Sequence, residues 1–386
     1  MSRTKKSKAV PVVIVLTILI AALAILCFLI KPLVIEPQKA AIAKANADAR
    51  AAVEERNKQA EAEYKALIAE LEAKANEPTN PSWPEHDPDA AWQILDLSDI
   101  PLESQTAETK TRADLFKYGN EMLLVNAWHS RPENDFDESE LKSVSKYNQG
   151  DLKIQAKDNN VLLYPKAIQA LTVALADAKA AGYTHYLVDG GYRSYKTQEE
   201  YFNNKVNKLS SKYTGEALIE AAKKEVNYPG TSEYNSGFGF DLRLYDRNDP
   251  DVGAPKYSTT PEGKWMNENC WKYGFVFRFP QNAWPLETSS DKSFKTGVSV
   301  HLNLYRYVGK GNAAIMHYKD FTLEEYIEYL EEHPHIALFE NGVLKYEIYR
   351  QYVGEAPSFD VQLTRKTNTW ETSLDNMGAL ITVFYY

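Results

Sequence analysis

Three segments of the sequence combine glycines with polar side chains that could bind a small ligand or a metal ion. The first, DGGYRSYKTQEEY at 189–201, has paired glycines followed by Arg193, Ser194 and Gln198. An arginine at such a turn can bind a carboxylate through two parallel hydrogen bonds. The same pattern also fits an ordinary capped start of a helix that carries an arginine on its surface.

The second segment, PGTSEYNSGFGFDLRLY at 229–245, contains a carboxylate next to glycines. In a strand with a period of two, Asp241 shares its face with Gly237, Gly239 and Arg243, so there is room beside the carboxylate for a metal ion or a ligand. The alternative is a surface face with one aspartate and one arginine. The opposite face carries the apolar residues Phe238, Phe240, Leu242 and Leu244.

The third segment, TGVSVHLNLYRYVG at 296–309, alternates strictly between apolar and polar residues. A single histidine in such a strand, here His301, is more often a hydrogen-bonded structural residue than a ligand. The alternation predicts one apolar face of Val298, Val300, Leu302 and Leu304, and one polar face of Ser299, His301, Asn303 and Tyr305.

These segments need a folded framework of helices and strands to bring them together. Helices and strands alternate without a regular βαβ rhythm, which predicts an α+β fold. An amphipathic helix is expected at 163–181. A second helix is expected at 322–332, with Thr322 as N-cap and Glu325 as its capping-box partner. The expected strands are 121–127, 186–189, 237–245, 298–308 and 379–385.

The region before residue 91 has a different composition. Residues 9–30 are apolar and uncharged and follow a basic tail at 1–8, which predicts a retained transmembrane helix with the N-terminus in the cytoplasm. A cleaved signal peptide is the alternative. Residues 38–76 favour a helical stalk, or a weak coiled-coil homodimer, and the proline-rich residues 77–90 a linker.

Composition excludes some classes of protein. The chain has 386 residues with 44 Lys and Arg against 53 Asp and Glu, a net charge of −9. Four of the cations lie in the first eight residues, so the rest is more acidic still and does not suit nucleic acid. The two cysteines, Cys27 and Cys270, provide neither a disulfide framework nor a cysteine-based zinc site.

Taken in order, the segments resemble the active-site blocks of the VanY-like D-alanyl-D-alanine carboxypeptidases, which are zinc peptidases of peptidoglycan. The resemblance covers roughly residues 119–332 and implies a central, mostly antiparallel sheet with flanking helices in a domain at 91–332. Residues 333–386, with SLDNMGALITV at 373–383, resemble a small β-rich extension found after such domains. The matching blocks are YRSYKTQ (192–198), PGTSEYNSGFGFD (229–241), YGFVFRFP (273–280) and TGVSVHLNLYRYVG (296–309).

The chemistry of that family is nevertheless incomplete in this chain. The family's zinc-ligand positions fall on Tyr234, Asp241 and Leu304, of which only Asp241 matches. His301 stands where the family has its general-base glutamate, and Asn303 where it has a tryptophan. A catalytic zinc needs three protein ligands and an open position for water, so no zinc and no family-type hydrolysis are expected.

The positions that the resemblance assigns to substrate binding are retained: Tyr192, Arg193, Ser194, Gln198 and Ser232. The leading hypothesis is therefore an extracytoplasmic pseudoenzyme, anchored in the membrane, that binds peptidoglycan stem peptides or a cell-wall synthesis protein. One alternative is an active metallo-carboxypeptidase with a rearranged site of Asp241, His301 and Tyr234. Another is a purely structural or interaction module with a vestigial groove, in which the stalk or the C-terminal β-rich tail carries the function. The polar face of His301, Asn303 and Tyr305 is expected to lie over the former site.

Overall fold

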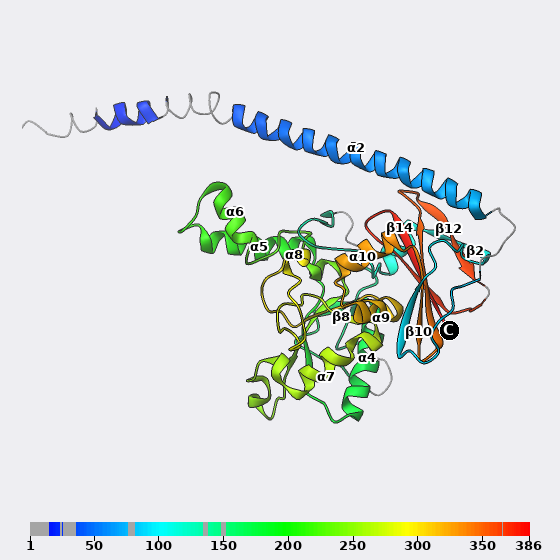
Figure 1. The fold of residues 1–386 in the computed structure, drawn as a ribbon. Helices are drawn as coiled ribbons and strands as arrows, with labels where there is room; N and C mark the ends of the chain where they lie inside the picture. The colour runs from blue at the N-terminus through cyan, green and yellow to red at the C-terminus, as the bar shows by residue number, and fades with distance from the viewer. Residues whose placement is uncertain are drawn as a thin grey trace, which may run out of the picture. The chain divides into compact units, whose positions relative to one another are not determined.

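The computed structural model describes residues 15–23, 25, 36–75, 82–133, 138–147, 152–364 and 366–386 (Figure 1). The chain forms two compact units, Met1–Pro78 and Thr79–Tyr386. The second unit contains all three of the segments singled out above.

The first unit contains the predicted anchor and stalk. Of the predicted transmembrane helix 9–30, residues 15–23 and 25 are described and helical, and the rest lies outside the described residues. No helix in the described part of the chain is both long and apolar enough to cross a membrane. The predicted helix at 38–76 is confirmed as α2 (Glu36–Ala75), which would be about 60 Å long. Its only proline, Pro37, lies in the first turn, where proline is tolerated.

The central sheet of the second unit has five strands in the order β4-β6-β7-β9-β8. Only β4 and β6 are parallel, and the other pairs are antiparallel, which confirms a mostly antiparallel sheet. The strands are β4 (Gln155–Ala156), β6 (Tyr186–Gly190), β7 (Gly239–Leu244), β9 (Leu304–Tyr307) and β8 (Phe275–Phe277).

One face of this sheet is covered by helix α4 (Pro165–Ala180), which confirms the helix predicted at 163–181. The alternation in β7 sends Phe240 and Leu242 into the same core as Ile168 and Leu171 of α4. Burial of each such side chain stabilises the fold by about 1.5–3 kcal/mol. Asp241 is consequently directed to the other face of the sheet, where the candidate site lies.

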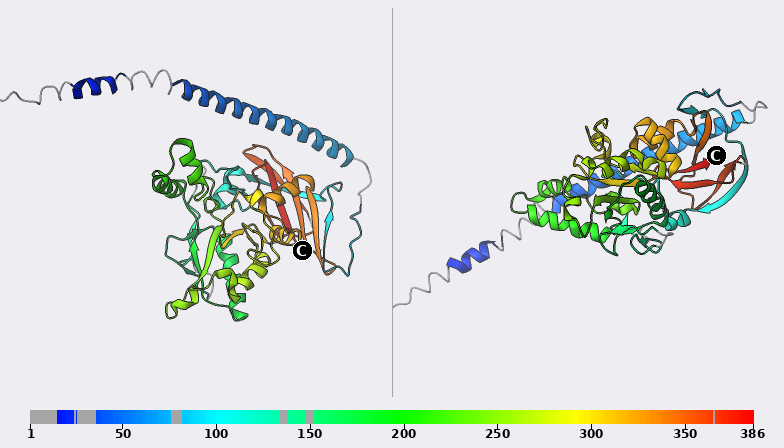
Figure 2. Two further views of the ribbon diagram at one scale, coloured as in Figure 1. Left: turned by 60° about the vertical axis from the view of Figure 1, so that its left-hand side comes forward. Right: turned by 90° about the horizontal axis from the view of Figure 1, so that it is seen from below.

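A second five-stranded sheet has the order β1-β10-β11-β14-β13. Helices α9 (Lys310–Lys319) and α10 (Leu323–Glu332) share its apolar core, and α10 has the predicted N-cap Thr322 and capping box with Glu325. Figure 2 shows the two helices beside this sheet. The strands are β1 (Trp92–Asp96), β10 (His335–Glu340), β11 (Val343–Tyr352), β14 (Ala379–Tyr385) and β13 (Trp370–Leu374).

Strands from both ends of the second unit build this sheet. The edge strand β1 pairs with β10 of the predicted C-terminal extension. In addition, β2 (Ser104–Thr111) pairs with β12 (Ser358–Thr364) in a two-stranded ribbon. The extension at 333–386 is therefore joined to residues 92–111 by backbone hydrogen bonds. The remaining elements include β3 (Lys142–Ser143), β5 (Leu162–Leu163), α3 (Arg112–Tyr118), α5 (Tyr195–Leu209), α6 (Gly215–Lys223), α7 (Pro261–Asn269) and α8 (Ser293–Thr296).

One predicted strand, 121–127, is wrong, and another, 298–308, is correct only in part. Residues 121–127 form turns and irregular structure, because side chains from elsewhere occupy their backbone groups. The Met122 amide donates to Ser373 Oγ at 2.9 Å, and Asn376 binds both the amide and the carbonyl of Leu124. In the predicted strand 298–308, only Leu304–Tyr307 is a strand, since only this part lies between β7 and β8.

Candidate functional site

The site begins where β6 ends at Gly190, which Gly191 follows. A Cβ atom at Gly190 would lie 2.9 Å from Asp241 Oδ2, and one at Gly191 would lie 2.7 Å from the carbonyl oxygen of Leu162. Both glycines therefore permit close approach, and the first of them brings the backbone of β6 against the Asp241 carboxylate.

A buried 3₁₀ turn, Glu233–Ser236, positions Tyr234 on the other side of that carboxylate. The turn is closed by two bonds: the Asn235 amide donates to the Ser232 carbonyl at 2.8 Å, and the Ser232 amide donates to Asn235 Oδ1 at 3.2 Å. The turn ends at Gly237, whose φ of 76° suits glycine. Ser232 is thus buried at the start of the turn, with its backbone holding the turn closed.

Tyr234, Asp241 and Leu304, the three positions that the resemblance assigns to zinc ligands, lie together in the structure. The Tyr234 hydroxyl donates a hydrogen bond to Asp241 Oδ2. Leu304 is the direct partner of Asp241 across the antiparallel pair β7–β9. Tyr234 and Leu304 also form a small buried apolar cluster with Phe279. A phenol and a leucine therefore occupy the space around the retained carboxylate.

The electrostatics of this pair follow from its burial. Burial raises the pKa of Asp241 to about 6, although the hydrogen bond from Tyr234 and the nearby Arg193 guanidinium favour the charged form. Burial also raises the pKa of Tyr234 well above its ordinary value, and the Asp241 carboxylate adds to the shift. Tyr234 therefore remains a protonated phenol at neutral pH and serves as a hydrogen-bond donor.

A zinc ion does not fit this set of donors. Asp241 is one ligand, the Tyr234 hydroxyl keeps its proton and uses it on that ligand, and Leu304 has no lone pair. Within the ranges that the structure describes, no three His, Cys, Asp or Glu side chains gather into a group that could hold a metal ion. The arrangement is suited to holding the carboxylate in place by a hydrogen bond.

His301 lies in an exposed loop before β9, and its ring contacts Trp284. Its ring stacks on Trp284 with centroids 4.6 Å apart and planes within 5°. The predicted polar face of His301, Asn303 and Tyr305 is wrong, because Tyr305 is buried in the main core and its hydroxyl bonds to Asn267. The predicted apolar face is confirmed in part: Leu304 shares an apolar cluster with the partly buried Leu302 and Val298, whereas Val300 is exposed.

Arg193 lies beside Tyr234. The Arg193 amide donates to the Tyr234 carbonyl at 3.1 Å, and Asn235 Nδ2 donates to the Arg193 carbonyl at 2.7 Å. Its guanidinium lies over the Tyr234 ring, 3.8 Å from the ring centroid. Arg193 also reaches Gln198 Oε1 at 3.4 Å, while Gln198 Nε2 donates to the Asn227 carbonyl at 2.8 Å.

Ser194 and Tyr192 have structural contacts of their own. Ser194 is the N-cap of α5, and its hydroxyl accepts from the Thr197 amide at 3.1 Å. The Tyr192 hydroxyl donates to Glu138 at 3.2 Å. The structure thus brings Arg193 and Gln198 together with Tyr234 and Asp241, while Ser194 and Ser232 shape the adjacent helix start and turn. Ligand binding by these five residues stays a prediction.

Sequence reasoning missed Tyr201, whose ring lies on Arg193 with its centroid 4.9 Å from the guanidinium carbon. Its spacing was the available signal, since it follows Gln198 by three residues on the same face of α5. It completes the surroundings of the arginine.

Sequence reasoning also missed a buried ion cluster formed by Glu233, Arg278, Arg306 and Glu324. Arg278 donates to Glu233 at 2.8 Å and to Glu324 at 2.9 and 2.6 Å, while Arg306 binds the other oxygen of Glu233. All four side chains are buried. Because Glu233 precedes Tyr234, the cluster fixes the 3₁₀ turn that positions the phenol.

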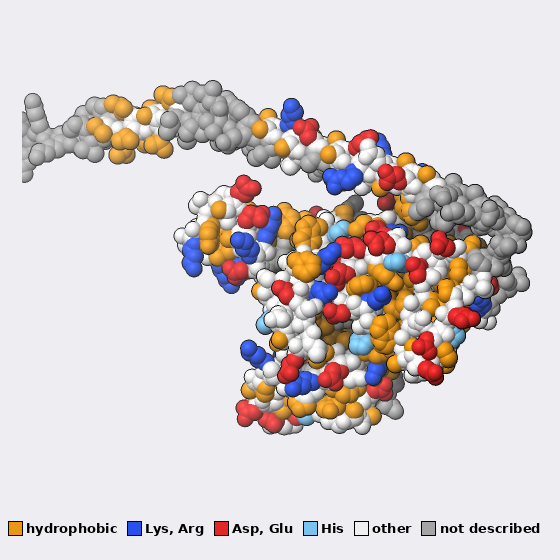
Figure 3. Space-filling model, viewed as in Figure 1, with side chains coloured by type: hydrophobic (Ala, Val, Ile, Leu, Met, Phe, Trp, Pro, Cys, Tyr) orange, Lys and Arg blue, Asp and Glu red, His pale blue; other side chains and the backbone are white. Residues whose placement is uncertain are grey.

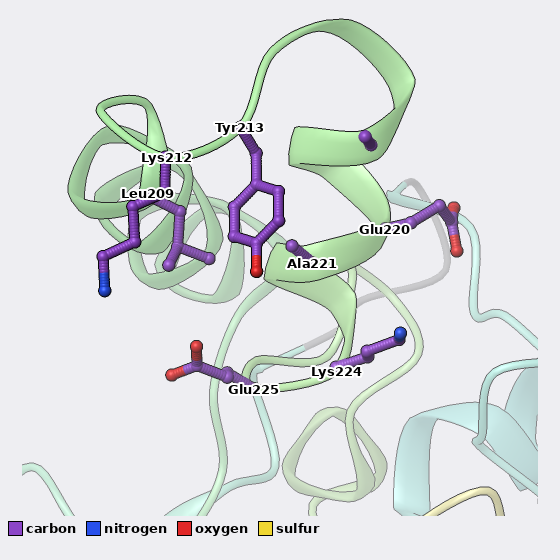
Figure 4. A pocket seen from close by; sticks show the side chains of 8 residues that line it. Leu209, Lys212, Tyr213, Glu220, Ala221, Lys224 and Glu225 are labelled. Carbon is purple, nitrogen blue, oxygen red and sulfur yellow. The ribbon is translucent and has the colours of Figure 1, made fainter.

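A pocket of about 480 Å³ lies apart from these residues, between α5 and α6 (Figure 4). Its lining combines the apolar Leu209, Ala217 and Ala221 with charged side chains. Figure 3 shows cationic and anionic side chains mixed on this projection, at the left of the view. The remaining lining residues are Lys212, Tyr213, Glu220, Lys224 and Glu225.

Comparison with known proteins gives a consistent result. The sequence profile of a family described as VanY, D-alanyl-D-alanine carboxypeptidase, matches residues 160–292. A D-alanyl-D-alanine carboxypeptidase of Enterococcus faecium is 28% identical over 282 residues, which are 73% of this chain and 80% of the relative. The putative carboxypeptidase YodJ of Bacillus subtilis is 31% identical over 235 residues, 60% of this chain and 77% of the relative.

One solved structure is similar over most of the chain. The vancomycin resistance D,D-dipeptidase VanXYg, solved with a D-Ala-D-Ala phosphinate analog, matches with a TM-score of 0.54. It shares 20% sequence identity and covers 73% of this chain and 100% of that one. This likeness concerns the fold.

Proposed function

Because the chain belongs to the family of VanY-like D-alanyl-D-alanine carboxypeptidases, we propose that it binds peptidoglycan stem peptides without hydrolysing them. The observation that carries this proposal is the hydrogen bond from Tyr234 to Asp241, with Leu304 opposite the same carboxylate. Neither Tyr234 nor Leu304 supplies a second metal ligand beside Asp241, so a zinc-bound water is not expected at this point.

Retained binding is supported by the position of Arg193 beside the candidate site. Arg193 is held by backbone bonds to the 3₁₀ turn and lies partly exposed beside the buried Gln198. A guanidinium can bind a carboxylate through two N–H groups at once. A peptide that ends in D-Ala-D-Ala has its terminal carboxylate as the matching group, and a cell-wall synthesis protein would be the alternative partner.

The test combines metal analysis, turnover and binding on the purified full chain. We expect less than about 0.1 zinc per chain by elemental analysis, because a single protein ligand does not hold zinc. We also expect no release of D-Ala from a pentapeptide that ends in D-Ala-D-Ala. We expect that pentapeptide to bind, and Arg193→Ala to weaken binding by about 10- to 100-fold, because a hydrogen-bonded charge pair is lost. Arg247→Ala, an exposed arginine after β7, is the matched control.

Stoichiometric zinc together with chelator-sensitive release of D-Ala would instead establish the active carboxypeptidase with a rearranged site. If the wild type does not bind the pentapeptide, or if Arg193→Ala binds it as tightly as the wild type does, only the hypothesis of a structural module remains.

The location of the protein is part of the same proposal. We propose that residues 9–30 anchor the chain in the cell membrane, with the N-terminus in the cytoplasm and the binding unit outside, beyond the helix α2. The basic residues before the apolar run support this orientation. Protease added to intact cells should digest the second unit; protection of that unit would contradict the orientation. Crosslinking of α2 would test the homodimer.

A further inference from the structure

Strand β2 is the outer strand of its two-stranded ribbon and pairs with β12 on one side alone. Among the strands that the structure describes, no other pairs with β2 (Figure 1). Its side chains from 106 to 109 are all exposed, so neither face of the strand is covered there. An edge strand offers its outer N–H and C=O groups to a further strand, and a two-stranded ribbon gains stability when more strands extend it.

β2 also lacks several of the features that protect edge strands from pairing with other chains. It contains no proline, and its register with β12 is regular from Thr106 to Thr111. The edge strands of the two five-stranded sheets, β1, β13, β4 and β8, have two to five residues, whereas β2 has eight. Natural edge strands are usually short, interrupted or covered. The length and regularity of β2 therefore favour a partner strand.

The hydrogen bonds of the ribbon indicate which residues of β2 direct their backbone outward. Bonded and unbonded pairs of opposite residues alternate along an antiparallel ribbon. The Arg112 amide donates to the Pro357 carbonyl at 2.9 Å, so this pair is bonded. Counting from it, Thr109 and Ala107 lie in unbonded pairs, and their N–H and C=O groups point away from β12. The residues opposite these two on β12 bind the Gln351 side chain through their own backbone, as outward-facing residues can.

The charges of β2 suit a second copy of the same strand. Glu108 and Lys110 share one face and form a partly exposed ion pair at 2.5 Å. If a second β2 runs antiparallel with Thr109 opposite Thr109, Glu108 of each copy lies opposite Lys110 of the other, and opposite charges across a strand pair are stabilising. A register with Glu108 opposite Glu108 would place like charges together. The contact is symmetric, so it closes after two chains.

We propose that the outer edge of β2 is the contact between two copies of this chain, in which the two β2 strands pair in antiparallel register about Thr109 and join both ribbons into one sheet. This inference does not depend on ligand binding at the candidate site.

The first test exchanges the charges of β2 in the purified full chain in detergent. Lys110→Glu leaves two acidic residues on this face, and Glu108→Lys leaves two basic residues. Sedimentation velocity over a range of concentrations should show wild-type dimers. Each variant alone should dimerise with a dissociation constant weaker by about 10-fold or more, because both cross-strand pairs become like-charged. An equimolar mixture of the two variants should restore dimers of near wild-type affinity.

The mixture is its own control, because it contains the same two chains as the separate samples. A wild type that stays monomeric at every concentration overturns the inference. Dimers that persist unchanged in both variants would be held elsewhere, for example by α2, and overturn it as well.

The second test locates the two-fold axis by a disulfide. Thr109→Cys and Thr106→Cys are each combined with Cys27→Ser, which leaves the buried Cys270 as the remaining natural cysteine. The Cα atoms of a bonded pair at the axis are about 5.5 Å apart, which suits a disulfide, whereas two copies of residue 106 would be about 20 Å apart. Oxidised glutathione should therefore crosslink Thr109→Cys and leave Thr106→Cys uncrosslinked in a denaturing gel. Equal crosslinking of the two variants, or none of either, overturns the proposed pairing.

Discussion

Replacement of Asp241 by asparagine should make the second unit more stable at alkaline pH and change the pH dependence of its unfolding. The Asp241 carboxylate is held in a buried place next to a phenol, and burial raises its pKa from 3.8 to about 6. An asparagine has the same shape, and its amide oxygen can accept the hydrogen bond from Tyr234. It carries no charge at any pH.

The direction and the size of this change in the free energy of unfolding follow from proton linkage. A carboxyl group whose pKa is higher in the folded than in the unfolded state binds its proton more tightly when folded. Protonated Asp241 therefore contributes stability to the wild type, which is fully present below about pH 4 and is lost as the pH rises through about 6. At about 1.4 kcal/mol for each pH unit between 3.8 and about 6, the loss amounts to about 3 kcal/mol.

The assay is urea unfolding of the full chain, followed by tryptophan fluorescence at intervals between pH 4 and pH 8. The free energy of unfolding of Asp241→Asn minus that of the wild type should increase by about 2.5 kcal/mol over this range, because a small part of the effect lies below pH 4. Any constant effect of the amide cancels in that increase. Asp99→Asn, at an exposed position, is the control and should leave the difference nearly flat.

A difference that stays constant from pH 4 to pH 8, or that falls as the pH rises, would refute the reasoning. The first result would mean that Asp241 is solvated in the folded protein. The second would mean that the folded protein stabilises its charged form, as a bound cation would.

Two further predictions concern the same region. The double variant Tyr234→His, Leu304→His should place two histidines beside Asp241, because Tyr234 contacts that carboxylate and residues 241 and 304 are direct partners across β7–β9. Elemental analysis of this variant should find one zinc per chain. Zinc at the wild-type level would show that the three side chains do not converge. Arg278→Met should destabilise the second unit by about 3–5 kcal/mol, because it leaves Glu324 buried without an arginine and Glu233 with Arg306 alone. Arg243→Met breaks an exposed pair with Asp189 and should change the free energy of unfolding by less than about 1 kcal/mol. Equal effects of the two substitutions in urea unfolding would contradict the role of the buried ion cluster.

Features with a strong local pattern could be predicted from the sequence. Helix α4 and strand β7 are confirmed because their apolar residues recur at the helical and strand periods, and α10 because its capping box marks its start. The run 121–127 misled because its backbone is bound by side chains more than 180 residues away in the chain, and nothing within the run indicates them.

The candidate site was also predictable only in part. The resemblance of the sequence blocks to the family implied that Tyr234, Asp241 and Leu304 lie together, as they do. The stacking of Tyr201 on Arg193 depends on side-chain orientations that no spacing determines. The alternation at 298–305 gave the wrong environment for Tyr305, because an alternating sequence does not say where hydrogen bonding to neighbouring strands begins.

The pairing of β1 with β10 restricts how this protein can be divided. A chain cut after Glu332 would keep β1 but lose every other strand of its sheet, and the apolar faces of α9 and α10 would be exposed to water. Such a fragment should be prone to aggregation. Any transplant of this unit into another protein should therefore include both the segment that starts at Trp92 and the final strand that ends at Tyr385.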